Sequence, residues 1–168
     1  MMNSIASGAA GAVALTLAHE ATRRTVADAP RMDVLGKRAL AAGLRAADVS
    51  PPGEPAMHAA TLAGDLASNG AYYALVGLGG ADGAVTRGAL LGLAAGLGAV
   101  FLPGPLGLGT APSRRTSRTA LMTVGLYALG GLVAGATFGA LADRPPTVNS
   151  SARLRLIAVA THGERVGV

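Results

Sequence analysis

Apolar residues along the chain gather in four long runs that are separated by polar segments. The runs cover about residues 5–20, 57–79, 84–102 and 119–141. A membrane-spanning helix needs about 20 residues, so the last three runs are long enough to cross a bilayer. The first run is shorter, but no Lys or Arg precedes it as in a signal peptide, so we predict a retained helix. The pattern predicts an all-α integral membrane protein, a four-span helix bundle.

Residues 32–48 show a different pattern, with apolar residues at helical spacing and basic residues on other faces. This arrangement is typical of a short amphipathic interfacial helix that lies in the headgroup plane. A helix that caps the cytoplasmic end of the bundle would show the same pattern. Prolines at positions 51, 52 and 55 end this segment. We therefore predict that residues 1–142 form the transmembrane bundle and that residues 143–168, which begin close to Pro145 and Pro146, form a flexible tail.

Composition agrees with a membrane protein. The chain is 51% hydrophobic and only 14% charged, and its mean hydropathy is +0.45. Soluble domains usually carry about 25% charged residues. The absence of cysteine excludes disulfides and thiol chemistry. Thirteen of the 14 basic residues are arginine, a bias that indicates a GC-rich bacterial genome and therefore the bacterial cytoplasmic (inner) membrane.

The basic residues also predict how the spans are oriented. Nine of them lie in the two segments that follow the first and third runs: Arg23, Arg24, Arg31, Lys37, Arg38, Arg45, Arg114, Arg115 and Arg118. None precedes the first run, and none lies in the turn at residues 80–83. Because loops rich in Lys and Arg stay cytoplasmic, we predict a multi-pass protein with its N-terminus outside. The basic loops would then contact anionic lipid headgroups.

Glycines in the third and fourth runs recur at four-residue intervals. They are Gly88, Gly92 and Gly96 in the third run, and Gly131, Gly135 and Gly139 in the fourth. This spacing places the glycines on one helix face, where two backbones can approach closely. We predict a helix-packing role for these glycines, either between the two spans or between copies of the chain.

Polar residues in the second run form a single stripe. On a helical wheel His58, Asp65 and Asn69 lie within about 40° of one another, and Tyr72 flanks them. An aspartate that faces lipid costs several kcal/mol, so this stripe is expected to face protein or a water-filled cavity. The first run ends in the same leaflet with His19 and Glu20.

Several roles for this stripe are compatible with the sequence. Asp65 could pair with a residue of the first span and fix how the two helices pack, or the stripe could line a path for a proton, a cation or a small polar solute. A zinc or iron site is a weaker hypothesis, because the His and acidic residues lack the spacing of a metal-binding motif. Intramembrane hydrolysis is weaker still, because Ser68 lies off the stripe and no Gly-x-Ser-x-Gly motif is present.

The sequence favours a structural or interaction protein with glycine-packed helices over an enzyme. A carrier or channel-like protein that uses the stripe is the alternative. We predict no cofactor and no metal site. Possible partners are a second copy of the chain or another membrane protein. Nucleic acid is not expected, because no aromatic residue is interleaved with the arginines at 114–118.

Overall fold

The computed structural model describes residues 1–143, and these residues are helical with no strand among them. The helices are α1 (Met2–Thr25), α2 (Met32–Ala46), α3 (Glu54–Tyr73), the 3₁₀-helix η1 (Ala74–Leu78), α4 (Ala84–Phe101), α5 (Ala111–Arg114) and α6 (Ser117–Ala142). The prediction of an all-α protein is confirmed for this part of the chain. The predicted tail, residues 143–168, lies outside the described residues apart from Asp143.

The helix bounds differ from the predicted ones where polar residues extend a helix beyond its apolar run. α1 continues to Thr25, because its last turn carries Arg23 and Arg24, which suit a helix C-terminus. The predicted second span divides into α3 and η1, and Arg87 binds the carbonyl oxygen of Val76 in η1. The short helix α5 has no apolar run of its own and was not predicted.

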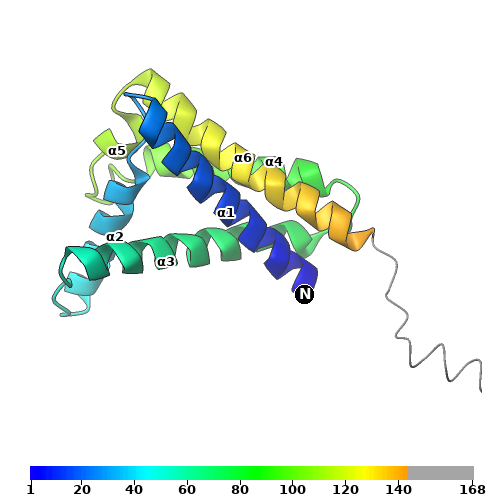
Figure 1. The fold of residues 1–168 in the computed structure, drawn as a ribbon, viewed down its shortest axis with the longest axis horizontal. Helices are drawn as coiled ribbons and strands as arrows, with labels where there is room; N and C mark the ends of the chain where they lie inside the picture. Colours follow the sequence, from blue (N-terminus) through cyan, green and yellow to red (C-terminus); the bar gives the residue numbers. More distant parts are fainter. Residues whose placement is uncertain (144–168) are drawn as a thin grey trace, which may run out of the picture.

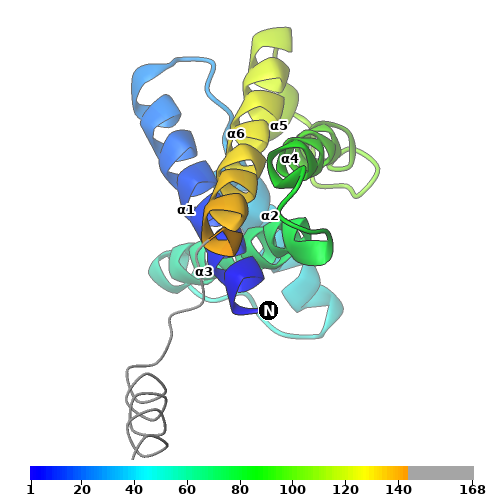
Figure 2. The same cartoon turned by 90° about the vertical axis from the view of Figure 1, so that its right-hand side faces the viewer.

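Three long helices lie side by side, and α6 is the central one. α6 packs against α4 on one side and α1 on the other, as Figures 1 and 2 show. α3 crosses α1 near the start of α1, and the two helices then diverge toward α2 (Figure 1). The buried core lies around this crossing and includes Leu15, Tyr73, Val76, Ala134 and Phe138.

Glycines form the contact between α4 and α6. An added Cβ at Gly92 would lie 2.5 Å from the Tyr127 carbonyl oxygen, and one at Gly135 would lie 2.5 Å from that of Ala84. Gly88 and Gly131 face each other in the same contact, and Gly96 packs on Val124. Gly139 is the exception among the six predicted packing glycines, because no atom lies within 4 Å of the place of its Cβ.

Two further glycine contacts, which the four-residue pattern does not reveal, position α1. Gly8 of α1 faces Gly70 and Ala74, where α3 meets η1. Gly11 faces Gly130 of α6, and a Cβ at Gly11 would lie 2.7 Å from the Gly130 carbonyl oxygen. α1 therefore touches both neighbours through backbone rather than through large side chains.

The two basic segments meet at one end of the molecule. The Arg31 N–H donates to the Pro112 carbonyl at 2.8 Å, and the Arg115 guanidinium pairs with Asp28 at 3.0 Å. The Thr119 hydroxyl also donates to the Asp28 carbonyl. α2 lies at the same end and packs on α3 and α5, and its own residue Leu35 is buried in this contact. α2 therefore packs against this end of the molecule.

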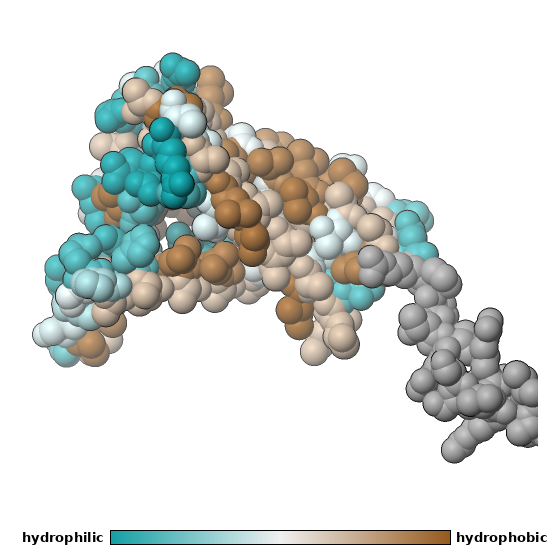
Figure 3. Space-filling model, in the orientation of Figure 1, coloured by the Kyte–Doolittle hydropathy of each residue, from teal (hydrophilic) through white to brown (hydrophobic). Residues whose placement is uncertain are grey.

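By length and composition, α4 and α6 could cross a membrane. α1 and α3 do not meet the same apolarity criterion, so the predicted four spans are not confirmed. The physical reason is that α1 and α3 carry polar side chains within their length, including His19 and Glu20 on α1 and Asp65 and Asn69 on α3. Hydrophilic residues gather at the end that carries α2 and α5, whereas apolar residues cover the body of the molecule (Figure 3).

Candidate functional site

A polar cleft of about 540 Å³ opens where α1 and α3 diverge. Its walls combine residues of α1 and α3 with Tyr127 of α6 and the segment that enters α2. The residues that line it are Leu15, Thr16, Leu17, His19, Glu20, Arg23, Arg24, Pro30, Met32, Asp33, His58, Thr61, Leu62, Asp65, Asn69 and Tyr127. Five of the six residues predicted for a polar path therefore line one cleft: His19, Glu20, His58, Asp65 and Asn69.

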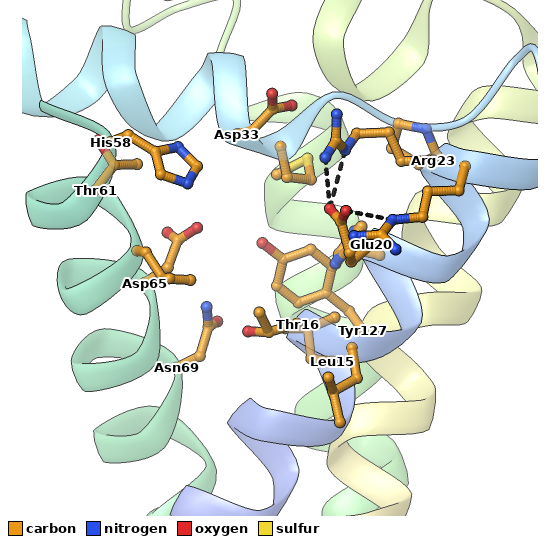
Figure 4. Close-up of a pocket in the computed structure, with 16 residues that line it drawn as sticks. Leu15, Thr16, Glu20, Arg23, Asp33, His58, Thr61, Asp65, Asn69 and Tyr127 are labelled. Carbon is orange, nitrogen blue, oxygen red and sulfur yellow. Dashed lines mark hydrogen bonds and ion pairs between the residues drawn. The ribbon is translucent and has the colours of Figure 1, made fainter. Parts of the chain in front are cut away.

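The α3 wall of the cleft is the polar stripe itself. Asp65 and Asn69 project from successive turns of α3 toward α1, and His58 and Thr61 lie above them near the mouth (Figure 4). The Asp65 carboxylate is partly buried and has no hydrogen bond or ion pair within residues 1–143. Pairing of Asp65 with a residue of the first span, one of the roles that the sequence allowed, is therefore absent among the described residues.

The α1 wall, in contrast, carries charges that are already paired. The Glu20 carboxylate accepts from the Arg23 guanidinium at 2.6 Å and from that of Arg24 at 2.7 Å (Figure 4). These residues lie three and four positions apart on one helix, so the contacts follow from helix geometry. Because Glu20 holds both arginines, neither one reaches across the cleft to Asp65.

Asp33 and Arg31 form another pair close to the cleft mouth. The Arg31 guanidinium donates to both Asp33 carboxylate oxygens, at 3.1 and 3.2 Å. Partial burial acts to raise the pKa of the Asp33 carboxyl, but the hydrogen bonds and charge of Arg31 outweigh it and hold this pKa below its ordinary value. The Asp33 carboxylate at the cleft mouth is therefore paired with a counterion, unlike the carboxylate of Asp65.

Two buried polar atoms of the lining residues have no partner in the described chain. They are the Thr61 hydroxyl oxygen and His19 Nε2. The His19 ring packs edge-on against Tyr127, with ring centroids 5.7 Å apart. Buried polar atoms are nearly always hydrogen-bonded in native proteins, so these two atoms are exceptions among the described residues.

Tyr72 is the predicted site residue that the fold directs elsewhere. Its hydroxyl donates to the Leu91 carbonyl of α4 at 3.1 Å, so this hydrogen bond connects α3 to α4.

Tyr127 lines the cleft, although the sequence did not predict it as a site residue. It comes from α6, a helix whose own pattern reports only its packing on α4, so no local signal marked it.

The cleft offers no ready metal site. Within residues 1–143, no group of three His, Asp or Glu side chains converges closely enough to hold a metal ion. His19 and Glu20 belong to α1, whereas His58 and Asp65 belong to α3 on the other wall of the cleft. The zinc or iron reading of these four residues therefore has no geometric support.

The cleft is closed at one end only. The contact of Gly8 with Gly70 and Ala74 brings α1 and α3 together below Asn69. At the other end the two helices separate beside α2, among the basic residues. The arrangement can admit a solute from the basic end and stop it at the helix crossing.

Comparison with known proteins gives no relative for this architecture. No protein-family model, no curated protein and no solved structure matches the chain. The functional argument therefore depends on the geometry of the cleft.

Proposed function

We propose that the protein is a multi-pass membrane protein in which α1, α3, α4 and α6 cross the bilayer. Large apolar side chains of α4 and α6 face outward, among them Leu90, Leu97, Phe101 and Leu121, while the glycines face inward. In each of these two helices, only 28% of the apolar 18-residue segment that could cross a membrane is buried. Soluble proteins bury such side chains and rarely expose large apolar patches. In a bilayer the same faces contact lipid, and small residues allow the helices to pack.

The distribution of charge supports an orientation for this bundle. All nine Lys and Arg residues of the two basic segments lie at the α2–α5 end. Arg87 is the only basic residue at the opposite end within residues 1–143, and its guanidinium is occupied by backbone carbonyls. The basic end is then cytoplasmic and the N-terminus lies outside. The Arg-rich composition makes the bacterial inner membrane the proposed location.

Some of the basic residues remain available for lipid. Arg45 and Arg118 are exposed, and their side chains make no hydrogen bond or ion pair with the rest of residues 1–143. Both lie at the proposed cytoplasmic boundary, where anionic headgroups attract basic side chains by about 1 kcal/mol each. We assign anionic lipid as the partner of these two residues.

The function that the cleft supports best is binding and carriage of a small polar or charged solute. One observation carries this proposal: Asp65 faces an open cleft and has no protein partner among the described residues. A residue that only fixes helix packing would be enclosed and paired. Intramembrane carboxylates that face a cavity instead mark pathways for solutes and ions. The α1–α3 crossing at Gly8 supplies the closed end that a carrier needs.

A second candidate function is an interaction protein, supported by the outer face of α3. Ala59, Ala63, Ala67 and Ala71 are exposed and lie four residues apart. Small residues at this spacing favour close approach of another membrane helix. This helix would come from a second copy of the chain or from another membrane protein.

The solute-binding proposal is tested by the reactivity of single cysteines, which the cysteine-free chain makes possible. In membranes exposed to a charged, impermeant thiol reagent on the basic side, Asn69→Cys in the cleft should be labelled. Leu93→Cys, on the lipid-facing side of α4, should stay unlabelled, and Arg45→Cys on α2 should react fully. Asn69→Cys as unreactive as Leu93→Cys would contradict a solvent-filled cleft and leave the interaction role.

A further inference from the structure

The walls of the cleft differ in the charge that they leave uncompensated. On the α1 wall the single carboxylate of Glu20 pairs with two guanidinium groups, so one positive charge is in excess there, and at the mouth Asp33 pairs with Arg31. On the α3 wall Asp65 alone has no counterion within residues 1–143, and the neighbouring His58 lies exposed at the mouth. A carboxylate in a membrane protein normally has a partner, because removing its charge from water is costly. A cation bound in the cleft would supply the partner that Asp65 lacks.

Neutral polar groups surround this carboxylate and limit what kind of cation it takes. Asn69 lies one turn from Asp65 on the same helix, and Tyr127 faces both residues from α6 (Figure 4). The Thr61 hydroxyl, on a residue that is only 7% exposed, has no partner. Asn69 and Tyr127 can accept hydrogen bonds from a ligand next to Asp65, and the Tyr127 ring offers an aromatic surface of the kind that attracts cations.

The size and apolar lining of the cleft favour an organic ligand over a bare ion. Its volume of about 540 Å³ falls within the range of small-molecule sites, whereas one water occupies about 30 Å³. Leu15, Leu17, Leu62 and Met32 line it alongside the polar groups. Leu17 and Leu62 are also exposed, at 64% and 41%, so the apolar part of the cleft continues onto the outer surface.

We propose that the cleft binds a small organic cation with an apolar body, whose positive group pairs with Asp65. The apolar body lies against the leucines of the walls, and Asn69 completes the contacts around the charged group. This inference rests on the proposed solute-binding function and adds the ligand class.

Two probes of the same shape and opposite charge test this inference. The intact protein in lipid nanodiscs is dialysed against labelled tetraphenylphosphonium or tetraphenylborate, and binding to empty nanodiscs is subtracted. The wild type should bind the cation saturably and should not bind the anion saturably. Asp65→Asn, which keeps the shape but removes the charge, should weaken cation binding at least tenfold. Asp143→Asn, an exposed carboxylate outside the cleft, is the matched control and should bind as the wild type does.

Asp65→Glu guards against a simple folding defect, because it keeps the negative charge and should retain binding within a few-fold. The inference is overturned by an absence of saturable cation binding to the wild type, by equal binding of the anion, or by wild-type affinity in Asp65→Asn. If Asn69→Cys is still labelled from the basic side in that case, the solute-binding proposal stands and only the ligand class is wrong. An unreactive Asn69→Cys would remove both.

Discussion

At the scale of single residues, Arg87 shows a role that its sequence position did not reveal. Its guanidinium donates to the carbonyl oxygens of Val76 at 3.1 Å and Asp82 at 2.8 Å, and also to that of Gly80. Carbonyls at the end of a helix lack intrahelical donors and need other partners. One side chain of α4 therefore fixes the end of η1 and the turn that leads back into α4.

Replacing Arg87 should destabilise the fold measurably. Arg87→Ala removes three charge-assisted hydrogen bonds, each of which contributes about 1.5–3 kcal/mol. Water at this end of the bundle can bind the freed carbonyl oxygens and so offsets part of the loss. We expect the free energy of unfolding to fall by about 1–3 kcal/mol, measured by thermal unfolding in detergent. Arg45→Ala, which removes an exposed arginine without a protein partner, should leave it unchanged. Equal stability of the two variants would show that the Arg87 contacts contribute nothing.

The candidate site shows how far residue patterns predict a structure. The helical wheel brought His58, Asp65 and Asn69 onto one face because that relation depends only on helix geometry. The partners of Asp65 could not be predicted, because they depend on how α1 and α3 cross. That crossing is set by Gly8 and Gly70, which lie outside the repeated glycine pattern. Tyr127 was not predicted as a site residue, because its position in the cleft likewise depends on how the helices pack.

At the scale of the helices, the α4–α6 contact distinguishes a glycine that is required from one that is not. An added Cβ at Gly135 would meet the Ala84 carbonyl oxygen at 2.5 Å and the Val85 Cα at 2.8 Å. Backbone atoms cannot move aside as a flexible side chain can. Gly139, one turn later on the same helix, has open space at this position.

These two glycines therefore make a matched pair. Gly135→Ala should lower the free energy of unfolding by about 1–3 kcal/mol, the usual cost of overpacking a close contact, because α4 and α6 must separate. Gly139→Ala should leave stability unchanged or raise it slightly, since alanine favours helix. The measurement is thermal unfolding of both variants in one detergent. A Gly135→Ala variant as stable as Gly139→Ala would mean that the helices are not in close contact at Gly135.

Helix existence was predictable from apolar runs because each run is continuous and long. The ends were less predictable, since they depend on contacts made elsewhere in the chain. α6 begins at Ser117 because the Thr116 side chain accepts from the Thr119 N–H, and Thr119 and Thr123 bind carbonyls of Asp28 and Ser113. These contacts lock the two basic segments onto each other, so fewer of their side chains remain for lipid than the sequence suggested.

At the scale of the whole molecule, the proposed topology makes a simple prediction. Reporter fusions at Arg45 and Arg115 should both report the cytoplasm, because the two segments lie at one end and carry the excess of positive charge. A fusion at Asp82, in the turn at the opposite end, should report the outside. Opposite sides for Arg45 and Arg115 would contradict the membrane bundle, since the structure holds these segments together.

The central claim is that α1 and α3 meet at one end and stand apart at the other. Pairs of spin labels on the cysteine-free chain measure this directly in lipid nanodiscs. One pair, Ala9→Cys with Ala71→Cys, reports the helix crossing, and the other, Ala21→Cys with Ala59→Cys, reports the cleft mouth. All four positions are exposed and therefore accept labels. We predict a clearly longer distance at the mouth than at the crossing; a mouth distance as short as that at the crossing would mean that α3 packs along α1 and that the cleft does not exist in the bilayer.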